Sequence, residues 1–328
     1  MGFNSKNSTC SNIVFLIDIL TLAAHLAKGD TLFLITRVLF LIIVKLNNER
    51  LRAFYQVAVD KNFHKAAENI CITQSAFSQR ILKLEQEVGA TLVIRGSEGI
   101  KLTEAGLNLF AYVRDLKNRE EETLASITGH AAGVASGTLR IAAYSSVLQS
   151  VIMPALSQLI HDSPDIHVEF FSRELGNLPD MLKSGEVDFI VLDYYMDALN
   201  VKNIQVGVEH LVHVKNIGRS DEDQVFLDHD VDDMTTYNFF REQDRKSVEQ
   251  RRCYYDDIYG IIKGVELGLG QAVVSRHLIA DADDIQIVTH PVSVSNPVVL
   301  HHQENRYLTS FHREVIRSLQ EGAASFLD

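Results

Sequence analysis

The chain has 328 residues, of which 46% are hydrophobic and 23% charged, an ordinary globular composition that is long enough for two or three domains. Its formal net charge of −12 excludes a uniformly basic, nucleic-acid-coating surface. The charge is unevenly distributed, because residues 1–102 hold twelve Lys and Arg against eight Asp and Glu, whereas residues 103–328 hold nineteen against thirty-five. The widely spaced Cys10, Cys71 and Cys253 predict neither a disulfide framework nor a metal site, and they fit a reducing compartment.

Residues 1–45 differ from the rest of the chain. Two apolar runs, Ile13–Ala27 and Leu32–Val44, are interrupted by polar and charged side chains, and neither reaches the roughly eighteen apolar residues of a membrane-spanning helix. A secretory signal peptide is an alternative, but no clean small-residue cleavage pattern follows the first run. We interpret residues 1–45 as an apolar extension, which a start codon assigned too far upstream would explain, and membrane attachment remains the alternative.

The stretch Phe63–Gly89 predicts two short helices joined by a three- or four-residue turn. The second helix begins at Gln74, after Thr73 as its cap, and its apolar residues recur at i, i+4, i+7 and i+11 as a single stripe. The residues of this stripe are Phe77, Ile81, Leu84 and Val88. An ordinary amphipathic hairpin with a solvated polar face has this pattern, and so has the helix-turn-helix of DNA-binding proteins.

A strand, a glycine turn and a second strand follow, over residues 92–102, and they predict a two-stranded wing. From Glu104 to about Thr128 the chain has no proline and predicts one long helix. An apolar seam at coiled-coil-like spacing runs along it, formed by Ala105, Leu109, Tyr112 and Leu116. The seam packs either within the chain or against another copy. The small residues from Gly129 to Gly137 predict a hinge.

These elements together resemble the LysR-type transcriptional regulators. The resemblance covers about residues 46–113 and rests on Leu51, Phe54 and Val57, on NFHKAAENICITQSAFSQRILKLEQEVGATLVIR, and on the closing KLTEAG, all in family order. Two residues depart from the family pattern, Phe77 in place of a smaller aliphatic residue and Cys71 in the turn. The resemblance implies that the long helix pairs with its copy in a second subunit.

Candidate DNA-binding residues lie on the polar face of the second helix and in the wing. Amide and hydroxyl side chains can reach base edges, and basic side chains can anchor phosphates. The candidates are Thr73, Gln74, Ser75, Ser78, Gln79, Arg80, Lys83, Arg95 and Lys101.

After Gly137 strands alternate with helices, which predicts an α/β domain with a largely parallel sheet. Such sheets bind ligands beyond the carboxyl ends of their strands. Ser145 and Ser146 follow the first expected strand, and Asp193 follows the third. A plain helix cap explains the two serines equally well. Further on, Asp256 is expected to cap a helix over residues 257–267, and the chain is expected to re-enter a strand over residues 268–275, which include Gln271.

The resemblance implies two α/β subdomains around an effector cleft in this half. The expected organisation is an extension at 1–45, a winged helix-turn-helix at 46–103, a linker helix and hinge at 104–136, and an effector-binding domain at 137–328. Subdomain I takes residues 137–205 and 291–328, and subdomain II takes residues 206–290. Ser145, Ser146, Asp193 and Gln271 are the candidate effector-binding residues.

The predicted function is therefore a cytoplasmic transcription regulator that binds promoter DNA as a homodimer or homotetramer and responds to a small-molecule effector. No nucleophile elbow, phosphate loop or metal-ligand spacing occurs in the sequence, so we expect no enzymatic activity, cofactor or metal. A solute-binding or membrane-tethered receptor that uses the α/β half is the alternative. It leaves the helix-turn-helix and wing without a purpose.

Overall fold

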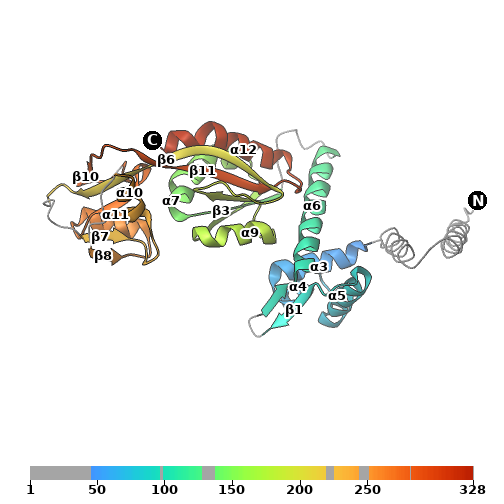
Figure 1. Cartoon of the computed structure of the whole chain (residues 1–328). Helices are drawn as coiled ribbons and strands as arrows, with labels where there is room; N and C mark the ends of the chain where they lie inside the picture. The colour runs from blue at the N-terminus through green and yellow to red at the C-terminus, as the bar shows by residue number, and fades with distance from the viewer. Residues whose placement is uncertain are drawn as a thin grey trace, which may run out of the picture. The chain divides into compact units, whose positions relative to one another are not determined.

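The computed structural model describes residues 46–96, 99–127, 137–218, 225–243, 251–280 and 282–327. The expected extension at 1–45, and the expected hinge except Gly137, lie outside these ranges. The chain divides into two compact units, one ending at Phe110 and the other starting at Ala111 (Figure 1). Over the described residues, the structure contains no helix with the length and apolar character needed to cross a bilayer.

The first unit is a winged helix-turn-helix. It consists of α3 (Asn48–Asp60), α4 (Phe63–Asn69), α5 (Gln74–Val88), β1 (Val93–Gly96) and β2 (Gly99–Leu102), with the two strands paired antiparallel. Side chains cap all three helices at their N-termini, since Asn47, Asn62 and Thr73 accept hydrogen bonds from free backbone N–H groups. The stripe predicted on α5 is confirmed at Phe77, Ile81 and Leu84, which are buried in the core of this unit, while Val88 at the end of the helix is half-buried.

The two departures from the family pattern have local explanations. The ring of Phe77 packs edge-on against Phe63, with centroids 5.5 Å apart, so the larger side chain fills space between α4 and α5. Cys71 adopts a left-handed conformation with φ 57°, which costs a non-glycine residue about 1–2 kcal/mol. Two backbone hydrogen bonds of 3.0 Å, from Cys71 to Glu68 and from Ile72 to Ala67, hold the turn in this shape.

Helix α6 (Glu104–Ile127) is the long helix that the sequence predicts. Thr103 begins it, because the Thr103 hydroxyl accepts a hydrogen bond from the Gly106 N–H at 3.0 Å. The helix starts in the first unit and continues into the second.

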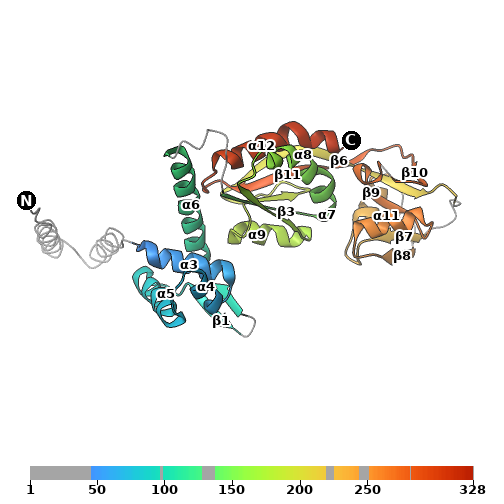
Figure 2. The same cartoon turned by 180° about the vertical axis from the view of Figure 1, so that it is seen from behind.

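The second unit begins with an α/β layer. Strands β3 (Gly137–Ala143), β4 (Ile166–Ser172) and β5 (Phe189–Leu192) are parallel, and they join the long β6 (Val201–Asn216) and β11 (Val294–Gln303) in one sheet. One face packs against α7 (Ser145–Val147), the short π-helix η1 (Leu148–Ile152) and α8 (Met153–His161). Helix α12 (Ser310–Gly322) and the 3₁₀ helix η4 (Ala323–Phe326) cover the same face. Helix α9 (Leu178–Ser184), after η2 (Leu175–Asn177), covers the other face (Figure 2).

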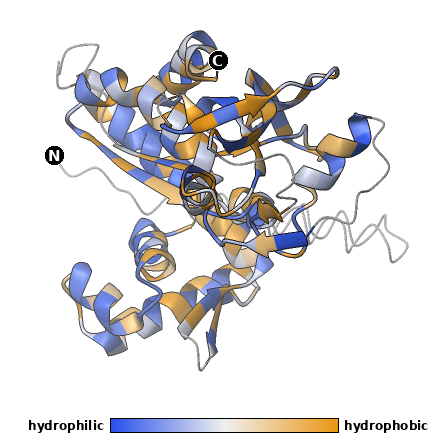
Figure 3. Cartoon of the chain, turned by 90° about the vertical axis from the view of Figure 1, so that its left-hand side faces the viewer, coloured by the Kyte–Doolittle hydropathy of each residue, from blue (hydrophilic) through white to orange (hydrophobic). Residues whose placement is uncertain are grey.

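The remaining elements form a second, smaller α/β layer. Strands β7 (Val225–Asp228) and β8 (Arg251–Tyr254) pair in parallel, while β9 (Ala272–Ser275) and β10 (Ile285–Val288) pair with the far end of β6. Helices α10 (Thr235–Glu242) and α11 (Ile258–Glu266) pack against these strands, and η3 (Arg276–Ile279) follows β9. Figure 3 shows orange and blue residues mixed along single helices, as amphipathic helices require.

The two layers correspond to the two expected subdomains, with two corrections to the predicted details. The sheet is mixed rather than largely parallel, because β6 and β11 run antiparallel through both layers and connect them. Asp257, rather than Asp256, caps α11, since its carboxylate accepts a hydrogen bond from the Gly260 N–H at 2.9 Å. The predicted subdomain boundaries at 205/206 and 290/291 remain predictions.

Candidate functional sites

The outer face of α5 is polar at its N-terminal end. Gln74, Ser75 and Gln79 are exposed, and Ser78 is half-buried. Thr73 is held in place by its capping role, because its hydroxyl accepts from the Ala76 N–H at 3.3 Å and lies 3.1 Å from the Ser75 hydroxyl. The apolar face is buried in the unit, so this polar face is the part of α5 that remains accessible to a partner such as DNA.

The basic candidates in the first unit are not equivalent. Lys83 is exposed on α5, and Lys101 is exposed on the wing strand β2. Arg80 forms an ion pair of 3.1 Å with Glu49, so a phosphate would have to replace this partner. The guanidinium of Arg95 stacks 3.7 Å above the ring of Phe63, which holds the wing strand β1 against α4.

A cleft lies where the two layers of the second unit meet. Its cavity has a volume of about 490 Å³ and is lined by Asp193, which follows β5, and by residues of β6, α10, the segment leading into β11 and the start of β11. The lining residues besides Asp193 are Leu211, Thr235, Asn238, Arg241, Glu242, Val292, Ser293, Val294, Ser295 and Asn296. Among the four effector candidates, Asp193 is the one that lines this cavity.

A buried polar network connects the two layers beside Asp193. The carboxylate of Glu209, on β6, accepts hydrogen bonds from the Tyr144 hydroxyl at 3.2 Å and from the Ser275 hydroxyl at 2.8 Å. The ring of His277 lies 3.4 Å from the same carboxylate and 2.9 Å from the Ser150 hydroxyl. Glu209 therefore holds the first layer, through Tyr144, and the second layer, through Ser275 and His277, at one point of β6.

Charge repulsion links Asp193 to this network. Burial, and then the nearby charge of Glu209, raise the pKa of Asp193 above its ordinary value. The pKa of the Tyr144 hydroxyl is also raised, first by burial and then by the charges of Glu209 and Asp193. Two carboxylates thus lie near each other, that of Asp193 at the wall of the cleft and that of Glu209 in the buried network beside it.

The other candidates have different surroundings. Ser145 and Ser146 follow β3, as predicted, but they are the first two residues of α7 after Tyr144, and Ser146 is buried. The Gln271 side chain is also buried, and its amide oxygen accepts a hydrogen bond of 2.7 Å from the ring of His213. That bond gives Gln271 a packing role next to the aromatic cluster of Phe226 and Phe240. Contact of these three residues with an effector remains a prediction.

Most of the cleft lining could not be predicted from the sequence. Apart from Asp193, it comes from three segments far apart in the chain, which contribute Leu211 on β6, Thr235, Asn238 and Arg241 on α10, and Asn296 on β11. The rule that ligands lie beyond the ends of parallel strands finds Asp193, but it gives no signal for residues on α10 or on the antiparallel strands.

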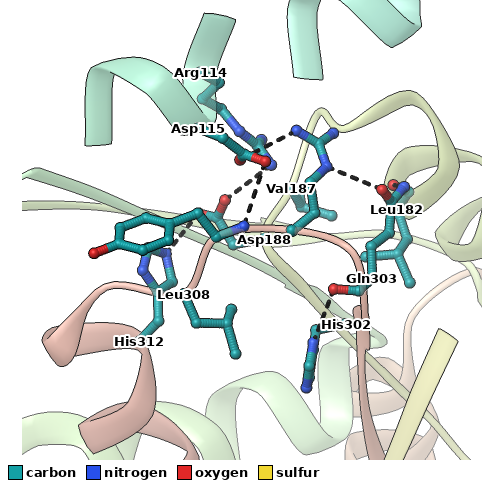
Figure 4. Close-up of a pocket in the computed structure, with 11 residues that line it drawn as sticks. Arg114, Asp115, Leu182, Val187, Asp188, His302, Gln303, Leu308 and His312 are labelled. Atoms are coloured by element: carbon teal, nitrogen blue, oxygen red, sulfur yellow. Dashed lines mark hydrogen bonds and ion pairs between the residues drawn. The ribbon is translucent and has the colours of Figure 1, made fainter. Parts of the chain in front are cut away.

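A smaller cavity lies where α6 meets the first layer of the second unit (Figure 4). Its volume is about 10 Å³, room for about one water molecule. Arg114 and Asp115 of α6 contribute to it, as do Asp188, Arg306 and His312. Arg114 lies 3.2 Å from Asp188, and Arg306 lies 3.5 Å from Asp115.

These buried charges shift one another. Burial raises the pKa of Asp188, but Arg114, His312 and the Arg140 N–H outweigh burial and lower the pKa to about 2. Burial and the neighbouring charge of Arg114 lower the pKa of Arg306 to about 10.

Among the described residues, no group of three or more His, Cys, Asp or Glu side chains is arranged to hold a metal ion.

The described residues thus combine a winged helix-turn-helix, a long helix and a two-layered α/β unit with a cleft. Comparison with known families identifies the chain more narrowly. Residues 48–107 match the model described as bacterial regulatory helix-turn-helix protein, lysR family, and residues 132–324 match the LysR substrate binding domain. The chain therefore belongs to the LysR family, which confirms the resemblance seen in its sequence.

Individual relatives agree with this assignment. The chain is 29% identical over 149 residues to the HTH-type transcriptional regulator PecT of Dickeya dadantii, a match that covers 45% of this chain and 46% of PecT. The chain spans about half the length of the curated relatives it matches. These findings do not favour a solute-binding or membrane-tethered receptor.

Solved structures share the fold. ArgP from Mycobacterium tuberculosis has a TM-score of 0.70 at 20% identity, covering 85% of this chain and 99% of that one. Full-length LysG from Corynebacterium glutamicum with bound effector Arg has a TM-score of 0.64 at 18% identity, covering 85% of this chain and 100% of that one. At these identities the likeness concerns the fold alone.

Proposed function

We propose that this protein is a sequence-specific transcription regulator that binds promoter DNA and is controlled by a small molecule in its C-terminal cleft. The observation that carries the proposal is α5, which buries one apolar face in the unit and leaves a face of amides and hydroxyls accessible. The relatives are named as transcriptional regulators, which supports a regulator rather than an enzyme. Promoter DNA as the partner implies action in the cytoplasm.

In this proposal, α5 enters the major groove. Gln74, Ser75, Ser78 and Gln79 contact base edges, where a good bidentate contact contributes about 1–3 kcal/mol of discrimination. Thr73 keeps the start of the helix in place. The basic residues Arg80, Lys83, Arg95 and Lys101 anchor phosphates and carry no sequence preference of their own.

The protein acts as a homodimer or homotetramer, so that two copies of α5 reach successive major grooves about 34 Å apart. Exposed apolar side chains on α6 support pairing of this helix with its copy. Tyr112 is 52% exposed and Ile127 is 73% exposed. They lie on a helix that already docks within the second unit through the pair of Arg114 and Asp188, so a partner helix would cover the surface that this docking leaves open. An effector that prefers one cleft geometry then changes how the subunits present α5 to DNA.

Salt-dependent DNA binding tests this proposal. The full chain is titrated onto the DNA upstream of its own gene and onto a scrambled fragment of equal length. Preference for the upstream fragment, with an affinity that falls steeply as salt rises, is expected. Equal affinity for the two fragments, or no binding to either, would refute sequence-specific regulation.

A further inference from the structure

The cleft in the second unit is polar and acidic at the wall formed by Asp193. Its hydroxyl and amide groups come from Thr235, Asn238 and Asn296 and from two serines, and its apolar surface comes from Leu211 and two valines. A volume of about 490 Å³ fits a small metabolite, because cavities that bind small ligands span roughly 300–1,000 Å³.

The charges around the cleft are unbalanced. Asp193 and Glu242 line the cavity with one basic residue, Arg241, whose guanidinium lies 3.7 Å from Glu242. Arg241 and Glu242 therefore already form a pair with each other. Over the described part of the chain, no ion pair involves Asp193.

A second carboxylate increases this imbalance. Glu209 is 4% exposed, its neighbours are two hydroxyls and the His277 ring, and its negative charge acts on Asp193. Placing two carboxylates near each other in a partly desolvated site is unfavourable unless a cation compensates them. A positive group in the cleft would supply that compensation, whereas a carboxylate ligand would add a third negative charge.

We propose that the effector is a small organic cation whose protonated amine or guanidinium group binds the carboxylate of Asp193 in the cleft. This inference rests on the proposed function, since it names the chemical class of the controlling ligand. Thr235, Asn238 and Asn296 provide hydrogen-bond partners for the rest of the molecule, and Leu211 contacts its aliphatic part.

The test measures ligand binding by the full chain without DNA. Thermal shift and calorimetry use putrescine, L-lysine and L-arginine as cationic probes, and succinate and benzoate as anionic probes. We expect at least one of the cations to bind and to raise the melting temperature of the protein, and we expect neither anion to do so. Stabilisation by an anion, or by none of the cations, would overturn the proposal.

Variants locate the binding group. Asp193→Asn keeps the shape and removes the charge, so cation affinity is expected to fall by about tenfold or more. Asp197→Asn, in the same loop but exposed and outside the cavity lining, is the matched control and should bind like the wild type. Unchanged cation binding by a folded Asp193→Asn variant would overturn the proposal. If that variant does not fold, the comparison of cations with anions on the wild-type protein still tests the proposal.

The outcome is separable from that of the proposed function. DNA binding is measured on the same preparation without effector. If the protein does not bind DNA, the proposed regulatory function is refuted, while the result of the ligand-binding test still holds. If the cation binds but changes neither the affinity for DNA nor the bending of DNA, the cleft is a cation site and the role of that cation as effector is overturned.

Discussion

The guanidinium of Arg114, on α6, lies 3.2 Å from the carboxylate of Asp188, the residue before β5, and both side chains are more than nine-tenths buried. Arg114 also donates a hydrogen bond to the carbonyl of Gly185. The same helix contacts the start of α12, because the Ser310 N–H donates to the carboxylate of Glu122 at 2.8 Å. The C-terminal half of α6 is thus an integral part of the second unit.

Replacing Arg114 by Met should destabilise the second unit by about 3–5 kcal/mol, because Asp188 would remain buried without its strongest partner. Chemical denaturation followed by circular dichroism measures the loss. Lys117→Met on the same helix is the control, since the ion pair of Lys117 with Glu121 is partly exposed and is worth about 0–1 kcal/mol. Equal losses in the two variants would contradict a special role for the buried pair.

Asp188 should also make stability depend on acid pH. The pKa of Asp188 is lowered from 3.8 to about 2 in the folded protein, so its contribution is complete above about pH 4 and is lost as the pH falls through 2. Asp188→Asn should be less stable than the wild type at pH 7, and the difference should narrow by about 2 kcal/mol between pH 4 and pH 2. Urea unfolding at several pH values measures it, and a constant difference would contradict the assignment.

The fold could be predicted where local pattern determines structure. The stripe of Phe77, Ile81 and Leu84 identifies α5 because one periodic face must be buried, and Thr103 marks the start of α6 because a hydroxyl caps free N–H groups. The same reasoning gave the wrong cap for α11. Asp256 and Asp257 are both good N-cap residues, and only the backbone conformation selects Asp257.

The cleft could be predicted only in part, because its residues meet through the tertiary fold. Asp193 follows a parallel strand and was found by that rule. Leu211 and Asn296 lie within β6 and β11, where nothing in the local sequence indicates that these strands run antiparallel between two layers. The pair of Arg114 and Asp188 likewise depends on how α6 docks, which no spacing along the chain indicates.

Base reading by α5 predicts a specific loss of discrimination. Gln74→Ala should reduce the preference for the cognate base by about 1–3 kcal/mol and weaken binding to random DNA much less. Competition binding with single-base operator variants measures the preference. Gln86→Ala, which changes an exposed residue near the other end of α5, should leave both affinities unchanged. Equal losses on cognate and random DNA after Gln74→Ala would exclude a base contact.

Phosphate anchoring predicts a different signature for Lys83. Lys83→Ala should weaken binding to all DNA sequences alike and reduce the slope of log affinity against log salt by about one. Fluorescence anisotropy from low to moderate salt measures the slope. Lys263→Ala changes an exposed lysine of the α/β unit and should leave the slope as it is. A change in sequence preference without a change in slope would argue that Lys83 contacts a base.

Pairing of α6 with its copy predicts that charge in the apolar seam disrupts the assembly. Tyr112→Glu should lower the mass of the particle at micromolar concentration, because Tyr112 is 52% exposed in the single chain and would be buried by a second helix. Sedimentation velocity measures the mass, and circular dichroism shows whether the variant remains folded. Leu199→Glu is the control, since Leu199 is 94% exposed in a loop of the α/β unit and is not a residue of the seam. If folded Tyr112→Glu sediments like the wild type, the subunits associate through another surface, and the two recognition helices must be spaced by contacts within the α/β unit.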